Sequence, residues 1–162
     1  MTTTISQDDL LGAAIGAIPS GLFIVSSQQN GKTATMLASW VQQSGFVPPS
    51  VTIIVGKGRA IESFLSVGSP VVINVIEKGD GKIIGHFAKG FAPDADPFED
   101  IATAPAPSGQ PYLSGAIAYL DATITSSLDA GDHIVLLATI ISGQRLSEGE
   151  PATHTRKNGF KY

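Results

Sequence analysis

The stretch that decides the fold runs from residue 31 to residue 59 and reads GKTATMLASWVQQSGFVPPSVTIIVGKGR. Small and polar residues follow a predicted strand, a Pro48-Pro49 turn comes next, and a second apolar strand leads to Lys57 and Arg59. Small side chains let a ligand approach the backbone closely, and the two cations suit a phosphate group. The stretch therefore predicts a site for a flat, phosphorylated ligand.

The composition describes one compact domain. A chain of 162 residues is long enough to bury most of its apolar surface around a single core. A net charge of −4 gives no field suited to nucleic acid, so we expect no nucleic-acid partner. The absence of cysteine excludes a disulfide scaffold, thiolate catalysis and cysteine-ligated metal. Redox chemistry would therefore need an organic cofactor, and no metal site is expected.

Residues 1–14 are interpreted as a polar leader and residues 15–162 as the domain. The first ten residues lack the basic and apolar stretches of a secretory signal. No apolar run reaches the roughly 20 residues needed to cross a bilayer. We expect a cytoplasmic protein that does not bind membranes.

Apolar runs bounded by turn residues predict about six strands and a few short helices. The first hairpin has arms at 21–27 and 32–41, joined by Gln28-Gln29-Asn30-Gly31. The other strands are expected at residues 51–55, buried on both faces, at 71–76, and in a hairpin of 119–127 with 133–142. Helices are expected at residues 10–17, 61–67 and 82–89, and an extended surface loop at 92–111, which holds five prolines. This pattern suggests a small barrel.

Several short motifs, taken in order, resemble the flavin-reductase-like domain family. They are Gly21-Leu22-Phe23-Ile24-Val25, Met36-Leu37-Ala38-Ser39-Trp40-Val41, Pro48-Pro49, Lys57-Gly58-Arg59, Val72-Ile73-Asn74-Val75, His86-Phe87, Gly131-Asp132-His133 and residues 154–162. The ordered set covers nearly the whole chain after about residue 15 and is far more specific than any one piece. The resemblance implies a mainly β fold with short helices, the FMN-binding split β-barrel. It extends in particular to the C-terminal flavin reductase module of cyanobacterial diflavin flavodiiron proteins.

That resemblance implies an NAD(P)H:FMN oxidoreductase module that passes electrons toward a diiron oxygen-reducing core in a longer protein. Hydride would move from nicotinamide to flavin, so the protein mainly positions the two rings. The residues carried over by motif as cofactor contacts are Thr35, Met36, Leu37, Ala38, Ser39, Trp40, Lys57, Arg59, Asn74, His86, Phe87, His133, His154 and Arg156. Among them, Lys57 and Arg59 would face the phosphate.

The chain departs from the family pattern at two positions. Leu37 stands where the family usually has threonine, and Gly45 stands where serine often precedes the Pro-Pro turn. Each change removes a hydroxyl that could donate to the cofactor. Losing such a bond costs roughly 1.5–3 kcal/mol, or about ten- to hundredfold in affinity. The sequence therefore predicts weakened flavin binding.

Plainer interpretations stay open for five of these residues. Lys57 and Arg59 follow a strand, where charges are most often solvated. Trp40 suits core packing, and His86 suits a partly buried histidine bonded to a carbonyl group. His133 suits the first residue of a strand.

The last ten residues form the only basic cluster of an acidic chain. This segment, 153–162, is either a disordered tail or a binding element for NAD(P)H phosphates or for the flavin of a partner subunit. Abundant valine and isoleucine with few charges predict a homodimer with flavin sites near its interface. Two other functions remain open: an electron-transfer module that never meets nicotinamide, and a degenerate barrel retained for assembly.

Overall fold

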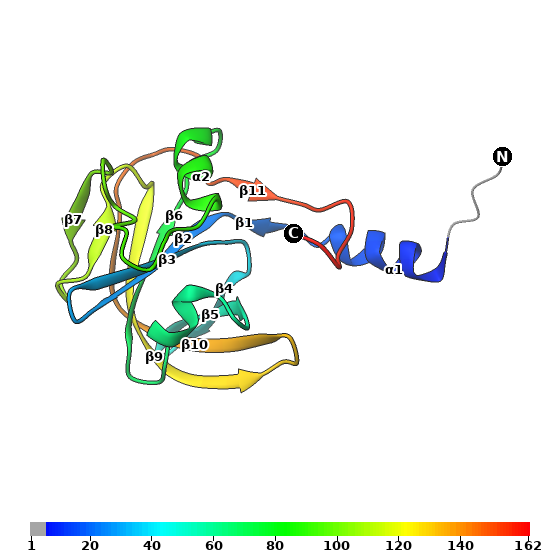
Figure 1. Ribbon diagram of the computed structural model, residues 1–162, viewed down its shortest axis with the longest axis horizontal. Helices are drawn as coiled ribbons and strands as arrows, with labels where there is room; N and C mark the ends of the chain where they lie inside the picture. Colours follow the sequence, from blue (N-terminus) through cyan, green and yellow to red (C-terminus); the bar gives the residue numbers. More distant parts are fainter. Residues whose placement is uncertain (1–5) are drawn as a thin grey trace.

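The computed structural model describes residues 6–162, and its centre is a seven-stranded antiparallel sheet (Figure 1). The strands in spatial order are β3(Lys32–Ala38), β2(Phe23–Gln29), β6(Pro70–Val75), β9(Ala118–Asp129), β10(His133–Arg145), β5(Pro49–Gly56) and β4(Val41–Phe46). Strands β3 and β4 are consecutive in the chain but lie at opposite edges of the sheet. The sheet curls until Ser39 and Trp40 alone connect its two edges, which gives the split β-barrel that the sequence predicted.

The first hairpin is confirmed, with its first arm shifted by two residues toward the turn and its second arm ending at Ala38 instead of residue 41. Asn30 and Gly31 both have positive φ, at 53° and 74°, so they form the two-residue turn that an Asn-Gly pair favours. Gln28 and Gln29 pair with Thr33 and Lys32, and therefore belong to β2 rather than to the turn.

The prediction missed strand β4 and misjudged the burial of β5. The chain leaves β3 at Ala38, and β4 returns beside β5 through the Pro48-Pro49 turn. Because β4 consists mostly of exposed glutamines and a serine, it lacks the alternation of apolar and polar residues that predicts a strand from sequence. In β5, Val51, Ile53 and Val55 are buried while the residues between them are only half-buried, so one face of this strand is left partly uncovered.

Three apolar cores are found among residues 6–162, and the two larger ones lie on opposite faces of the sheet. The barrel interior is filled by residues such as Val25, Met36, Ile53 and Ile73. The second core lies between the sheet and helix α2(Gly81–Ala88) and centres on Ile24, Ile76, Phe87 and Leu113. Asp80 caps this helix by accepting a hydrogen bond from the Ile83 amide at 3.0 Å. The predicted strands 71–76, 119–127 and 133–142 and the helix at 82–89 are confirmed within a few residues.

The other predicted helices need correction. The segment expected at 61–67 is a single 3-10 turn, η1(Ala60–Phe64), followed by Gly68 with φ 91°. Helix α1(Gln7–Gly16) begins before residue 10, because Ser6 and Asp9 form a capping box. Most of the segment interpreted as a polar leader is therefore helical, and its residues 1–5 lie outside the described part. No helix within residues 6–162 is both long and apolar enough to traverse a bilayer.

The predicted surface loop carries a small hairpin, β7(Thr103–Pro105) with β8(Pro111–Leu113). A second pair, β1(Ser20–Gly21) with β11(Thr153–His154), leads away from the barrel. We call β1, β11, α1 and residues 155–162 together the arm, which extends to one side of the barrel in Figure 1.

The C-terminal segment is ordered against α1 rather than a free tail. The amides of Arg156 and Gly159 donate to the Gly16 and Gly12 carbonyl oxygens at 3.0 and 2.6 Å. A Cβ on Gly16 would lie only 2.3 Å from the Arg156 carbonyl oxygen, so this contact requires glycine. Two glycines on one side of α1 thus fix the residues that lead to the end of the chain.

Candidate functional site

A cavity of about 720 Å³ lies where the barrel is split. Its walls are β3 with Ser39 and Trp40, the turn from Gly56 through η1, helix α2 with residues 90–95, and His154 and Tyr162 of the arm. The volume is within the range of small-molecule and cofactor sites. The cavity therefore combines a sheet edge, two helical elements and the arm.

Strand β3 exposes an unpaired backbone edge to this cavity. Its turn is closed by the Gln29–Lys32 pair, so residues 32, 34, 36 and 38 bond to β2. The N–H and C=O groups of the alternate β2 residues bond elsewhere, as the Gln28 amide does by donating to Gln110 Oε1 at 2.7 Å. By alternation, the N–H and C=O groups of Thr33, Thr35 and Leu37 point away from β2. These groups lie along the cavity wall, where they can form hydrogen bonds with a ligand.

The side chains of β3 leave the edge accessible. Ala34 and Ala38 are small, and the Leu37 side chain packs with the second core beside α2. Thr35 Oγ1 is buried without a hydrogen-bond partner among residues 6–162. An unsatisfied buried hydroxyl is costly, so this group marks a place where a polar ligand atom would be stabilising.

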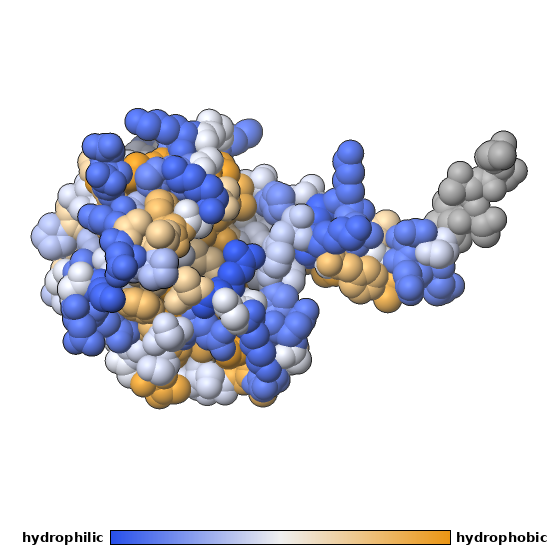
Figure 2. All heavy atoms as spheres, viewed as in Figure 1, coloured by the Kyte–Doolittle hydropathy of each residue, from blue (hydrophilic) through white to orange (hydrophobic). Residues whose placement is uncertain are grey.

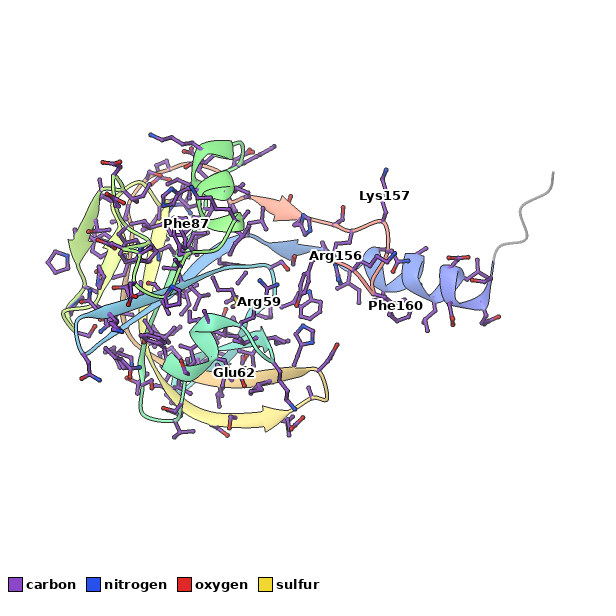
Figure 3. The ribbon with its side chains drawn as sticks, in the orientation of Figure 1. Arg59, Glu62, Phe87, Arg156, Lys157 and Phe160 are labelled. Atoms are coloured by element: carbon purple, nitrogen blue, oxygen red, sulfur yellow. The ribbon has the colours of Figure 1, made fainter. Side chains whose placement is uncertain are left out.

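The structure separates the two cations that the sequence placed together. Arg59 lines the cavity and has no carboxylate within ion-pair distance among residues 6–162. Lys57 lies outside the cavity lining, with Nζ 2.7 Å from Asp129 Oδ2. The hydrogen bond from Lys57 holds the pKa of the Asp129 carboxyl below its usual range. Glu62 accepts a hydrogen bond from the Gly58 amide at 2.6 Å, which fixes the turn that presents Arg59 (Figure 3).

Aromatic rings and cations close the arm end of the cavity. The Trp40 ring lies 5.0 Å from His133 and 5.5 Å from Tyr162, measured between centroids. The Arg156 guanidinium lies 5.0 Å from the centre of the Trp40 ring, and the Arg59 guanidinium lies 5.5 Å from that of Tyr162. Burial raises the pKa of Tyr162, while the two arginines oppose that effect.

The motifs did not indicate Tyr162 as a residue of the cavity. Its position there depends on how the C-terminal segment folds back along α1. His133 and Arg156 reach the cavity only through their contacts with Trp40 and Tyr162. Phe87 and His154 line it directly.

Besides Lys57, His133 and Arg156, two further predicted contacts, Asn74 and His86, lie away from the cavity lining. Asn74 is fully buried, with Nδ2 donating to the Ile24 carbonyl at 3.0 Å and Oδ1 accepting from the Leu113 amide at 2.8 Å. His86 Nε2 pairs with the Pro97 carbonyl at 2.9 Å, as its plainer interpretation described. Asn74 therefore joins the sheet to β8, and His86 joins helix α2 to the loop that follows it.

The packing around β4 explains why residue 45 is glycine, which the comparison of motifs could not show. A Cβ at this position would lie 2.6 Å from Ser50 Oγ and 3.1 Å from the Pro48 carbonyl. The residue lies in β4 at a shift of register, and not on the cavity. The missing hydroxyl at position 45 therefore leaves the cavity unchanged.

We expect Gly45→Ser to lower the free energy of unfolding by about 1–3 kcal/mol, as overpacked sites do. Denaturant unfolding measures this loss, and flavin titration of the folded variant should show an unchanged affinity. A serine variant that binds flavin more tightly would contradict this placement of Gly45.

A family model described as Flavin reductase like domain matches residues 15–161. The chain belongs to this family. It is 41% identical over 159 residues to Diflavin flavoprotein A 1 of Synechocystis sp., a match that covers 97% of this chain and 28% of that protein. The chain spans about a quarter of the length of the curated relatives it matches.

Solved flavin reductases share the fold of this domain. The NADH:FAD oxidoreductase SgcE6 of Streptomyces globisporus superposes with a TM-score of 0.81 at 26% identity, covering 88% of this chain and 85% of that one. The styrene monooxygenase flavin reductase of Pseudomonas putida S12 superposes with a TM-score of 0.75 at 20% identity, covering 88% and 90%. The split barrel of this flavin reductase like domain is thus the fold of known flavin oxidoreductases.

Proposed function

We propose that this flavin reductase like domain binds FMN in the cavity and reduces it with NAD(P)H. The observation that carries the proposal is the backbone edge of β3, which faces a cavity of suitable size and has no neighbouring strand among residues 6–162, beside Arg59, which has no carboxylate partner in that same range. Amide and carbonyl groups in alternation match the polar edge of a tricyclic flavin ring. Arg59 matches the phosphate ester.

The residues present fit this cofactor. Thr35, with its unpartnered hydroxyl, and the Leu37 backbone would hold the ring, and Arg59 would hold the phosphate. The bound flavin would supply the electron chemistry, accepting a hydride and delivering electrons. The chain's own part is to align the rings, to donate hydrogen bonds from β3, and to restrict water with α2 and the arm.

The electron donor is inferred from the arm end of the cavity, and the acceptor from the longer relatives. The Trp40, His154 and Tyr162 end of the cavity offers rings and nearby cations to a nicotinamide dinucleotide, whose use fits the expected cytoplasmic location. SgcE6 also has a structure in complex with NAD and FAD fragments. In a longer protein like the diflavin relatives, the acceptor would be a flavodiiron core.

We also propose a homodimer that forms through the arm. Leu10, Leu11 and Phe160 of the arm, and Ile18 in the link between α1 and β1, are large apolar side chains that are more than half exposed. Figure 2 shows an apolar patch on this projecting part. An unpaired projection of this kind is stabilised by burial against a second subunit. Sedimentation of the wild type and of Phe160→Ser tests this, with a monomeric wild type contradicting it.

The function is tested by titrating the protein with FMN and then adding NADH or NADPH without oxygen. We expect saturable binding followed by loss of the flavin visible absorbance. Binding without that loss would show an electron-transfer module that does not use nicotinamide. Absence of binding would show a barrel kept for assembly, and it would overturn the proposal.

A further inference from the structure

Two buried hydroxyl groups without a partner are neighbours across the β2–β3 hairpin. Within residues 6–162, three buried side-chain hydroxyls lack a hydrogen-bond partner, and they belong to Ser26, Thr35 and Ser142. Ser26 of β2 is directly opposite Thr35 of β3, and only 2% of Ser26 is exposed. Directly opposite residues lie on the same face of a sheet. Thr35 lines the cavity and Ser26 does not, so Ser26 lies one strand further inside.

The pairing of the two strands brings these side chains close together. Because residues 32, 34, 36 and 38 make the backbone bonds of the hairpin, Ser26 and Thr35 form a pair without backbone hydrogen bonds. Side chains approach each other more closely in such pairs than in bonded ones. Cross-strand hydrogen bonds between threonine and serine stabilise sheets at this spacing. The two hydroxyls are therefore placed to serve as partners of each other.

The other neighbours of Ser26 on this face leave its hydroxyl without a bond. Ile24 and Val72 are apolar and fully buried. The Gln28 side-chain amide donates instead to Thr33 Oγ1 at 3.0 Å. The threonine across the hairpin is thus the neighbour with a hydroxyl left to share.

A hydroxyl differs in one respect from the backbone groups along the β3 edge. An amide only donates and a carbonyl only accepts, whereas a hydroxyl does either. Hydride transfer from NAD(P)H leaves NAD(P)+ and adds two electrons and one hydrogen to a flavin ring. A ring nitrogen that accepts a hydrogen bond in the oxidised cofactor therefore donates one in the reduced cofactor. A group that reverses its direction fits both states.

We propose that Thr35 and Ser26 form a reversible hydroxyl pair that binds this ring nitrogen in both redox states. The inference rests on the proposed binding of flavin. With the oxidised ring, Thr35 donates to the nitrogen and accepts from Ser26. With the reduced ring, Thr35 accepts from the nitrogen and turns its own hydrogen to the Ser26 oxygen. The hydroxyls rotate and no proton is transferred, so Ser26 is a positioning residue that acts through Thr35.

The first test needs no flavin. A buried hydroxyl without a partner lowers stability, so an apolar group of similar shape should replace it at little cost. We expect the unfolding equilibrium constants of Thr35→Val and Ser26→Ala, from chemical denaturation, to stay within tenfold of the wild-type value or to fall below it. A larger rise in either variant would show that the hydroxyl already has a fixed partner, and it would overturn the inference.

The second test compares oxidised and reduced FMN. Removing the Ser26 hydroxyl leaves the Thr35 hydrogen without an acceptor only when the flavin is reduced. We expect Ser26→Ala to raise the ratio of the dissociation constants of reduced and oxidised FMN about tenfold. This change lowers the two-electron potential of bound FMN by about 30 mV. Anaerobic titration of the protein with each form of FMN measures the ratio.

Two control variants separate this effect from a structural one. Ser142→Ala removes the third hydroxyl, which lies in β10 and outside the cavity lining, and should keep the wild-type ratio. Thr35→Ser keeps the hydroxyl and should also keep the ratio. An unchanged ratio in Ser26→Ala, or an equal change in Ser142→Ala, would overturn the hydroxyl pair. A wild type that binds neither form of FMN would instead count against the proposed function.

Discussion

Replacing Arg59 with alanine is expected to weaken FMN binding by about ten- to hundredfold. Arg59 is the cavity-lining cation whose charge is unpaired among residues 6–162. A charge-assisted contact to a phosphate is worth about 1.5–3 kcal/mol, which corresponds to that loss. Isothermal titration with FMN measures it. Riboflavin, which lacks the phosphate, should bind Arg59→Ala as it binds the wild type.

Lys57→Ala is the matched control for this experiment. Lys57 is in the same turn, but its charge is used by Asp129 at the end of the β9–β10 hairpin. An exposed ion pair of this kind contributes about 0–1 kcal/mol to stability, so we expect a small effect on folding and an unchanged affinity for FMN. Equal losses of affinity in the two variants would show that the phosphate does not bind at Arg59.

Replacing Asn74 with alanine is expected to lower the free energy of unfolding by about 2–4 kcal/mol, because it leaves the buried Leu113 amide without a partner and removes the side-chain hydrogen bond to the Ile24 carbonyl. The amide joins the Ile24 carbonyl in β2 to the Leu113 amide in β8 and has no exposed surface. Chemical denaturation measures the loss. Gln43→Ala, at an exposed position of β4, should change stability by less than about 0.5 kcal/mol.

Asn74→Ala also separates a structural role from a role in binding. The sequence pattern predicted Asn74 as a cofactor contact, whereas its amide is fully used inside the protein. Under conditions where the variant is folded, its affinity for FMN should equal that of the wild type. A variant that keeps its stability but loses the flavin would show that the residue contacts the cofactor.

The sequence predicted the fold well because its information on the barrel is local. Apolar runs and the Asn30-Gly31 turn define most strands, and the ordered motifs point to the family. Strand β4 escaped because its exposed residues do not alternate, and the true length of η1 depends on how the chain turns at Gly68. Tertiary pairing rather than propensity decides both segments.

The site was less accessible to sequence reasoning because it depends on which partners meet in space. Lys57 and Arg59 are two residues apart, yet only the fold shows that Lys57 forms an ion pair with Asp129. The importance of Tyr162 arises from the glycine contacts that lay residues 156–159 on α1, far from it in sequence. The free edge of β3 follows from the order of the strands, which no motif encodes.

Binding of the flavin ring at the β3 edge, which has no neighbouring strand among residues 6–162, is tested by amide hydrogen exchange along this strand. In the free protein, the amides of Ala34 and Met36 should exchange slowly and those of Thr33, Thr35 and Leu37 quickly. Saturating FMN should slow exchange at Thr35 and Leu37 by tenfold or more and leave Ala34 and Met36 unchanged. Rapid exchange that persists at Thr35 and Leu37 in the FMN-saturated protein would contradict the account.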